Sequence, residues 1–330
     1  MAAPFYTSGT YSYGPTVYDV ICGSLRICGV IADEETPTAA QAANTLAAMA
    51  AMVKGWQATG IHVWAEDECL LFPQPRQTSY KIGAGSTDHL CLTDQLVQTF
   101  LTSSAADGAT TLTVDSIAGL ANGYILGVQA DDGFVFWTTI EGTPSGSTVT
   151  IADALTSAAA AGLLVFAYPT ALMRVLRVPN GRRRFWATGN ETPLIVMSRF
   201  DYDNLPNKTT PGIITQFFFD PQQGNGAYTN PQAVMNVWPA PTDYQNGMAF
   251  VGQRPIQDIS GLTQLPDFPV EWVAALKWGT ALEIAPEFDV EEPRTRIIAA
   301  QAERWLLLAR QWDKEPEPLL FGMAMSPGYR

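Results

Sequence analysis

Phe134-Val135-Phe136-Trp137-Thr138-Thr139-Ile140 is the stretch that most directly indicates the fold, because β-branched and aromatic residues follow one another in it. The turn-forming residues Asp131-Asp132-Gly133 precede it, and Pro144-Ser145-Gly146-Ser147 follow it. Similar short runs lie on both sides, at 111–114, 125–128, 148–151 and 163–166. We predict a small, self-contained β-sandwich or barrel over about 99–168, inserted into a larger β domain.

Strand-like runs continue after this module, punctuated by Gly, Pro, Asn and Asp. They lie at 172–178, 193–196, 212–219, 233–238 and 248–253. Gly181 beside Asn180, and Gly224 to Gly226, are expected to mark hairpin turns. We expect the strands on either side of the inserted module to belong to one sheet, since an insertion is tolerated where it enters an exposed turn.

The N-terminal end of the chain shows helical spacing instead. From Val17 to Ile31, apolar residues recur three and four positions apart and form one stripe, which predicts a first helix. A turn follows, with Thr36 as the expected N-cap and Pro37 in the first helical position. A second helix then runs to about Ala58.

A second helical pair is predicted near the C-terminal end. Pro269 opens one helix, which Pro286 ends, and another begins near Asp289 and continues to about Trp312. The apolar residues of this last helix stay mostly on one side, which we expect to be buried. They are Ile297, Ile298, Ala302, Trp305, Leu308 and Trp312.

These patterns predict an α+β fold in which the N- and C-terminal helical hairpins form a four-helix bundle. A central antiparallel β domain carries the inserted β-sandwich or barrel, and an extended C-terminal arm ends the chain. The expected domains are the N-terminal hairpin (1–66), the β domain (67–265), the C-terminal hairpin (266–312) and the arm (313–330).

Composition excludes several classes of function. A chain of 330 residues, 47% of them apolar, is long enough for two or three buried cores. The formal net charge of −13 argues against a protein that grips nucleic-acid phosphates. No stretch approaches the ~20 apolar residues of a membrane span, and the N-terminal residues lack the pattern of a signal peptide. We therefore expect synthesis in a cytoplasm and no membrane partner.

No pattern of metal ligation or catalysis stands out. The four cysteines, which lack Cys-x-x-Cys spacing, and the two histidines are Cys22, Cys28, Cys69, Cys91, His62 and His89. We expect neither a metal nor a cofactor. His89 beside Asp88 is the candidate for a catalytic triad, and a turn histidine is the ordinary alternative. Acidic clusters around Glu34 and Glu66 also fall at expected turns, so we predict no enzymatic activity.

Two features are candidates for contact with a partner. The first is Arg182-Arg183-Arg184 followed by Phe185-Trp186, expected at a hairpin tip that meets DNA phosphates, the carboxylates of a tail partner, or only solvent. The second is the apolar, Pro-containing arm, which is either a fraying end or a docking element, and we favour docking. Its candidate contact residues are Pro318, Leu319, Leu320, Phe321, Met323 and Met325.

Several segments, taken in order, resemble a known family. They are Leu25–Ile31, Glu35–Ala39, Leu46, Trp56, Gly60, Leu205–Lys208, Trp238–Pro241 and Leu282–Phe288. Their order and spacing resemble the head-to-tail adaptors of short-tailed bacteriophages, also described as tail accessory factors or head-completion proteins. The resemblance covers both helical ends and the flanking β domain, whereas the module at about 99–168 looks like an addition that longer members carry.

The resemblance implies a structural protein of the virion, made in the host cytoplasm and located at the junction of head and tail. It implies a homo-oligomeric ring, expected to be a 12-mer, that lies under the portal protein and extends the channel for DNA ejection without binding DNA specifically. The arm would bind the portal, and the β domain would bind the tail nozzle or hub and the fibres.

Two other functions stay open at this point. One is a virion-associated peptidoglycan hydrolase that acts through Glu34, Glu35, Glu66 or Glu68. The other is a carbohydrate- or receptor-binding tail protein that uses the inserted module.

Overall fold

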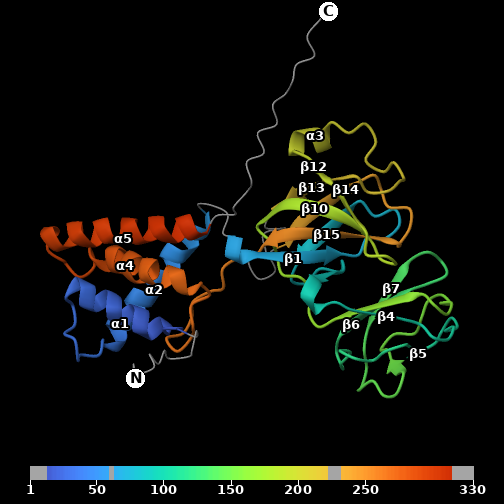
Figure 1. Ribbon diagram of the computed structural model, residues 1–330, viewed down its shortest axis with the longest axis horizontal. Coiled ribbons are helices and arrows are strands. Elements are labelled where there is room, and N and C mark those ends of the chain that lie inside the picture. The colour runs from blue at the N-terminus through green and yellow to red at the C-terminus, as the bar shows by residue number, and fades with distance from the viewer. Residues whose placement is uncertain (1–12, 59–62, 222–231, 314–330) are drawn as a thin grey trace, which may run out of the picture. The chain divides into compact units, whose positions relative to one another are not determined.

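The computed structural model describes residues 13–58, 63–221 and 232–313 (Figure 1). The chain divides into two compact units, with boundaries between Ala65 and Glu66 and between Pro255 and Ile256. One unit is helical and is built from both ends of the chain. The other is a β unit built from the middle.

The four long helices occupy the stretches where helical spacing predicted them, and the remaining helices are short. The helical unit contains α1 (Val17–Cys28), α2 (Ala39–Ala58), η1 (Val63–Ala65), η3 (Val270–Trp272), α4 (Val273–Ile284) and α5 (Glu292–Trp312). The predicted N-cap Thr36 is wrong, because α2 begins at Ala39 and Thr38 caps it. The Thr38 Oγ1 accepts from the backbone N–H of Gln41 at 3.2 Å, while Gln41 Oε1 accepts from Thr38 N–H at 2.8 Å.

Helix α4 lies at the centre of this unit, and α1, α2 and α5 pack around it (Figure 1). Its buried residues are spread around the helix rather than along one stripe, as expected for a helix covered on several sides. Gly279 allows close approach, since a Cβ there would lie 2.8 Å from the Met52 sulfur of α2. On another side, Ser24 of α1 donates to the Lys277 carbonyl at 2.8 Å.

The β unit contains most of the regular structure. Its strands are β1 (Glu66–Leu71), β2 (Ser79–Gly83), β3 (Leu90–Leu92), β4 (Val97–Phe100), β5 (Thr111–Thr113), β6 (Ile125–Gln129), β7 (Val135–Thr139), β8 (Thr148–Thr150), β9 (Leu164–Tyr168), β10 (Arg177–Phe185), β11 (Glu191–Pro193), β12 (Ile195–Val196), β13 (Gln216–Asp220), β14 (Gln232–Trp238) and β15 (Asn246–Gln253). The short helices η2 (Thr93–Gln95) and α3 (Arg199–Asp203) also belong to it.

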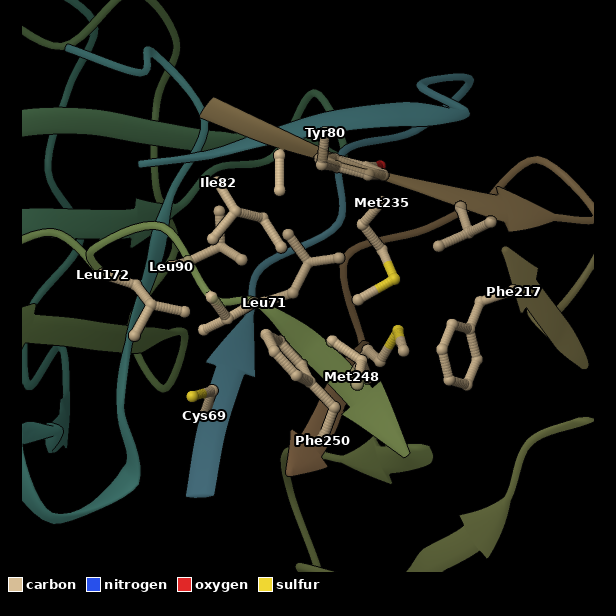
Figure 2. Close-up of a cluster of buried hydrophobic side chains, with 14 of the residues drawn as sticks. Cys69, Leu71, Tyr80, Ile82, Leu90, Leu172, Phe217, Met235, Met248 and Phe250 are labelled. Carbon is tan, nitrogen blue, oxygen red and sulfur yellow. The ribbon is translucent and has the colours of Figure 1, made fainter. Parts of the chain in front are cut away.

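Two sheets face each other across the core of the parent β domain. The first has the strand order β11-β10-β15-β1-β3 and the second the order β12-β13-β14-β2. Figure 2 shows side chains from both sheets, among them Leu71, Tyr80, Phe217, Met235 and Phe250, converging on one interior. The strands before and after the inserted module, β3 and β10, lie in the same sheet, which confirms that prediction.

The inserted module is a small sandwich with its own core. A four-stranded sheet of order β4-β9-β6-β7 faces the pair β5-β8. Buried aliphatic residues fill the space between them, including Leu112, Leu126, Val149 and Val165. The module begins at Val97, two residues before the predicted boundary, and it belongs to the same compact unit as its parent domain.

The predicted fold class is wrong. The described residues hold fifteen strands in four sheets, and only about 27% of the chain is helical, so the protein is mostly β. The helices do not form a bundle of two paired hairpins, because α4 sits centrally and α1 and α2 contact it more than they contact each other. The β unit is not purely antiparallel either, since β12 pairs with β13 in parallel.

An aromatic cluster joins the module to its parent domain. Successive residues of β1 pack into different hydrophobic cores. Leu71 faces the core shown in Figure 2, whereas Leu70 and the following Phe72 face the module. The Phe72 ring lies 5.0 to 5.1 Å, between centroids, from the rings of Trp137, Phe166 and Trp186. Strands β1 and β15 of the five-stranded sheet are therefore buried on both faces over part of their length.

His89 lies within the same cluster, and its burial gives the protein a predicted dependence on pH. The imidazole stacks on Trp137 at 3.9 Å between centroids, and its Nδ1 lies 3.0 Å from the Tyr168 hydroxyl. Burial lowers the pKa of His89 from 6.5 to about 4. Between these pH values the unfolded chain binds a proton that the folded chain does not. The contribution of His89 to the unfolding free energy is therefore fully present above about pH 6.5 and is lost as the pH drops toward 4.

We expect the wild type to lose about 2 kcal/mol more unfolding free energy than His89→Phe between pH 7 and pH 5, since each pKa unit corresponds to about 1.4 kcal/mol. The phenyl ring keeps the stacking and does not titrate. Urea unfolding at several pH values measures this difference. Equal losses in the two proteins would contradict the assignment.

Candidate interaction surfaces

The outer face of α5 is the most prominent apolar surface of the helical unit. Of the residues on this helix, Ile298, Ala302 and Ala309 are buried against its neighbours. Four large apolar residues point outward, and their exposed fractions range from 43% to 62%. They are Ile297, Leu307, Leu308 and Trp312, which we call the α5 face.

This surface corrects a sequence prediction. Ile297, Leu308 and Trp312 were expected on the buried side of the helix, and the structure leaves them 43% to 62% exposed. Helix α4 covers only a narrow stripe of α5, where small residues such as Ala302 and Ala309 make the buried contact. The large apolar residues beside that stripe therefore stay exposed. Large apolar residues left exposed on one helix are typical of a surface that another protein covers.

Helix α5 is more basic than the chain as a whole, although Arg294 donates to the Ile27 carbonyl and Arg296 pairs with Glu292. Helix α5 carries four arginines and two glutamates, whereas the whole chain has a formal net charge of −13. The Arg304 guanidinium lies over the Trp305 ring at 5.6 Å and so stays beside the exposed apolar residues. Such a surface suits an acidic protein partner.

The structure places Arg182, Arg183 and Arg184 inside β10 rather than at a hairpin tip. The strand continues through Gly181, where a Cβ would lie 2.7 Å from the Phe217 ring, so this glycine serves close packing rather than a turn. The chain reverses later, near Gly189, whose φ is 70°. The other expected turn, Gly224 to Gly226, lies outside the described residues.

These side chains are engaged within the β unit. Arg182 forms ion pairs with Glu68 of β1 and, from Nε at 2.7 Å, with Glu191 of β11. Arg184 also approaches Glu191, at 3.9 Å. Trp186 is buried in the aromatic cluster, and Phe185 is half-buried. The segment expected at a hairpin tip is therefore part of a sheet, where Arg182 and Arg184 are paired with glutamates.

The residues considered for catalysis have structural partners within their own units. Glu35 accepts from the backbone N–H of Ala32 at 3.1 Å in the helical unit, whereas Glu68 pairs with Arg182 in the β unit. Asp88 accepts hydrogen bonds from the Lys81 backbone and the Gln77 side chain, so it does not orient His89. Among the described residues, no group of three or more His, Cys, Asp or Glu is arranged to hold a metal.

A cavity of about 230 Å³ in the β unit contains the Cys69 thiol. Its wall is mostly apolar, with Leu172, Met173 and Val175, and the ion pair of Asp67 with Arg254 lies at 3.5 Å on another side. Burial raises the pKa of Cys69 to about 12, so the thiol stays protonated and is a poor nucleophile at neutral pH. The four cysteines are buried and free.

The candidate arm residues, Pro318 to Phe321 with Met323 and Met325, lie outside the described residues. Helix α5 ends immediately before this segment, at Trp312. Asp313 still belongs to the helical unit, because its Oδ1 accepts from the Trp64 backbone N–H at 3.4 Å and its own N–H donates to the Ala309 carbonyl.

Comparison with known proteins adds no relative. No family model matches the chain, and no curated protein matches it. None of the helices in the described ranges is both long enough and apolar enough to cross a membrane.

Proposed function

We propose that this protein is a structural head-to-tail adaptor of a phage virion, which assembles into a homo-oligomeric ring and acts by binding rather than by catalysis. The observation that carries the proposal is the α5 face, an apolar surface that the described residues leave 43% to 62% exposed, on the unit built from both chain ends. The order of the sequence segments that resemble head-to-tail adaptors supplies the phage context.

The partner of the α5 face in this proposal is a second copy of the chain. The face is apolar with Arg304 close to it, and each copy carries a net charge of −13, so charge favours contact between copies through different surfaces. A contact between two different surfaces repeats from copy to copy. It closes into a ring when the rotation from one copy to the next divides a full turn evenly. The portal protein is proposed to bind residues 314–330, and the β unit to bind the tail nozzle and fibres.

The proposal is tested by the mass of the assembled protein, with and without portal. We expect Ile297→Asp combined with Leu308→Asp to weaken association between copies by about 100-fold or more, because each substitution removes apolar burial of about 1.5 kcal/mol or more. The control is Phe200→Asp, which changes a still more exposed apolar residue in the β unit. Native mass spectrometry and electron microscopy provide the readout.

A truncation tests portal binding separately. The truncated chain should keep Asp313, because Asp313 forms hydrogen bonds with Trp64 and Ala309 of the helical unit. We expect the truncated protein to keep its thermal stability and to lose portal binding. A wild type that remains monomeric in the presence of portal, or a truncated protein that still binds it, would overturn the adaptor assignment.

A further inference from the structure

The inserted module and its parent domain enclose a cleft of about 460 Å³. One wall is the loop between β1 and β2, the opposite wall is the turn between β6 and β7, and residues from two further loops form the rest. The lining residues are Pro75, Arg76, Asp132, Gly133, Phe134, Pro211, Pro241 and Thr242. The cleft therefore exists only because the module is present.

The two walls are held by hydrogen bonds. The Gln74 side chain pairs with the backbone of Val135, donating to its carbonyl at 3.0 Å and accepting from its N–H at 3.1 Å. Arg76 N–H donates to the Pro241 carbonyl at 2.8 Å. This bond holds Arg76 at φ 69°, a left-handed conformation that is uncommon for a residue other than glycine. The cleft is thus preformed, and a ligand would not have to order its walls.

The cleft combines an aromatic ring with one acidic and one basic side chain. Phe134 is 43% exposed although it is a large apolar residue at a turn. Asp132 is oriented by its Oδ1, which accepts from the Phe134 N–H at 3.0 Å. Its second carboxylate oxygen can accept a ligand hydroxyl, and the Arg76 guanidinium can donate to ligand oxygens.

This combination fits a sugar better than a charged polymer. The flat face of a phenyl ring packs against the C–H face of a pyranose, while paired donors and acceptors bind its hydroxyls. Arg76 and Asp132 are the charged residues that line the cleft, and their charges are opposite, so the lining itself does not favour a strongly charged ligand. We propose that it binds one pyranose ring of a neutral glycan. This function is additional to ring assembly and does not depend on it.

Saturation-transfer NMR on the full chain tests the proposal with the methyl pyranosides of glucose, galactose, mannose and N-acetylglucosamine. We expect at least one to bind and Phe134→Ala to weaken that binding at least 10-fold. Asp132→Asn, which keeps the acceptor for the Phe134 N–H, should weaken it several-fold. The matched control is Phe100→Ala, since Phe100 is 41% exposed in the same module but does not line the cleft.

Absence of binding by all four sugars, or an equal effect of Phe100→Ala and Phe134→Ala, would overturn the glycan site. Binding of a proline-rich peptide at the cleft in place of a sugar would overturn it as well. Phe134→Ala should leave ring assembly unchanged, so failure of this proposal and failure of the adaptor proposal are distinguishable.

Discussion

Phe72→Ala is expected to lower the unfolding free energy of the β unit by about 4 kcal/mol, within the range for removing a buried aromatic ring. Phe72 is 2% exposed and contacts rings from both the module and the parent domain. Its loss leaves a cavity between Trp137, Phe166 and Trp186 and also removes the favourable ring contacts. The module should therefore loosen from the five-stranded sheet.

Two measurements distinguish this loosening from general destabilisation. Urea unfolding followed by tryptophan fluorescence gives the free energy, since Trp137 and Trp186 lie in the cluster. Amide hydrogen exchange should increase most in β6, β7 and β9. Phe100→Ala, which removes an exposed ring from the same module, should change stability by less than about 0.5 kcal/mol. Similar losses in the two variants would show that the cluster does not join module and parent domain.

The strand positions were largely predictable from the sequence, but the joint at Phe72 was not. β-branched and aromatic runs between turn residues located the module to within two residues at its start. The run Cys69-Leu70-Leu71-Phe72 is apolar without alternation, which is the signal of a strand buried on both faces. Periodicity within the module could not show that its sheet would cover this strand, so the module was predicted as self-contained although it shares a buried interface with its parent domain.

The error at Arg182 to Arg184 has a different cause. A glycine beside an asparagine is typical of a tight turn, yet Gly181 lies within β10 because Phe217 and Met248 occupy the space of a side chain. Local turn chemistry cannot show such tertiary packing. The arginines then lie beside Glu68 and Glu191, from strands that only the sheet order brings together.

The α5 face shows the limit of periodicity for the helical unit. Helical spacing correctly located the four long helices, and it placed Ile297, Leu308 and Trp312 on one side. It could not show that α4, being central, would be covered by three helices while α5 would be covered on one narrow stripe. Which apolar residues of α5 stay exposed depends on the helices that pack against it. The candidate surface could therefore be identified only from the structure.

Trp272→Ala is expected to lower the unfolding free energy of the helical unit by about 4 kcal/mol and to abolish the proposed ring assembly. Trp272 is fully buried, and its ring lies 5.8 Å from Trp56 of α2 and 5.7 Å from Phe268, between centroids. Ala309 of α5 belongs to the same cluster. Removing the indole therefore takes away part of the packing that holds the C-terminal half of α5.

Trp312→Ala provides the matched comparison, because it removes the same side chain from the exposed face of α5. It should change stability much less than Trp272→Ala does, because Trp312 is 51% exposed, and it should still weaken assembly, since the exposed part of its ring contacts the neighbouring copy in the proposal. Far-UV circular dichroism in urea gives stability, and native mass spectrometry gives the ring. If Trp272→Ala assembled normally despite its loss of stability, assembly would not depend on the placement of α5. If Trp312→Ala lost stability as Trp272→Ala does, the α5 face would be part of the fold rather than a surface for another copy.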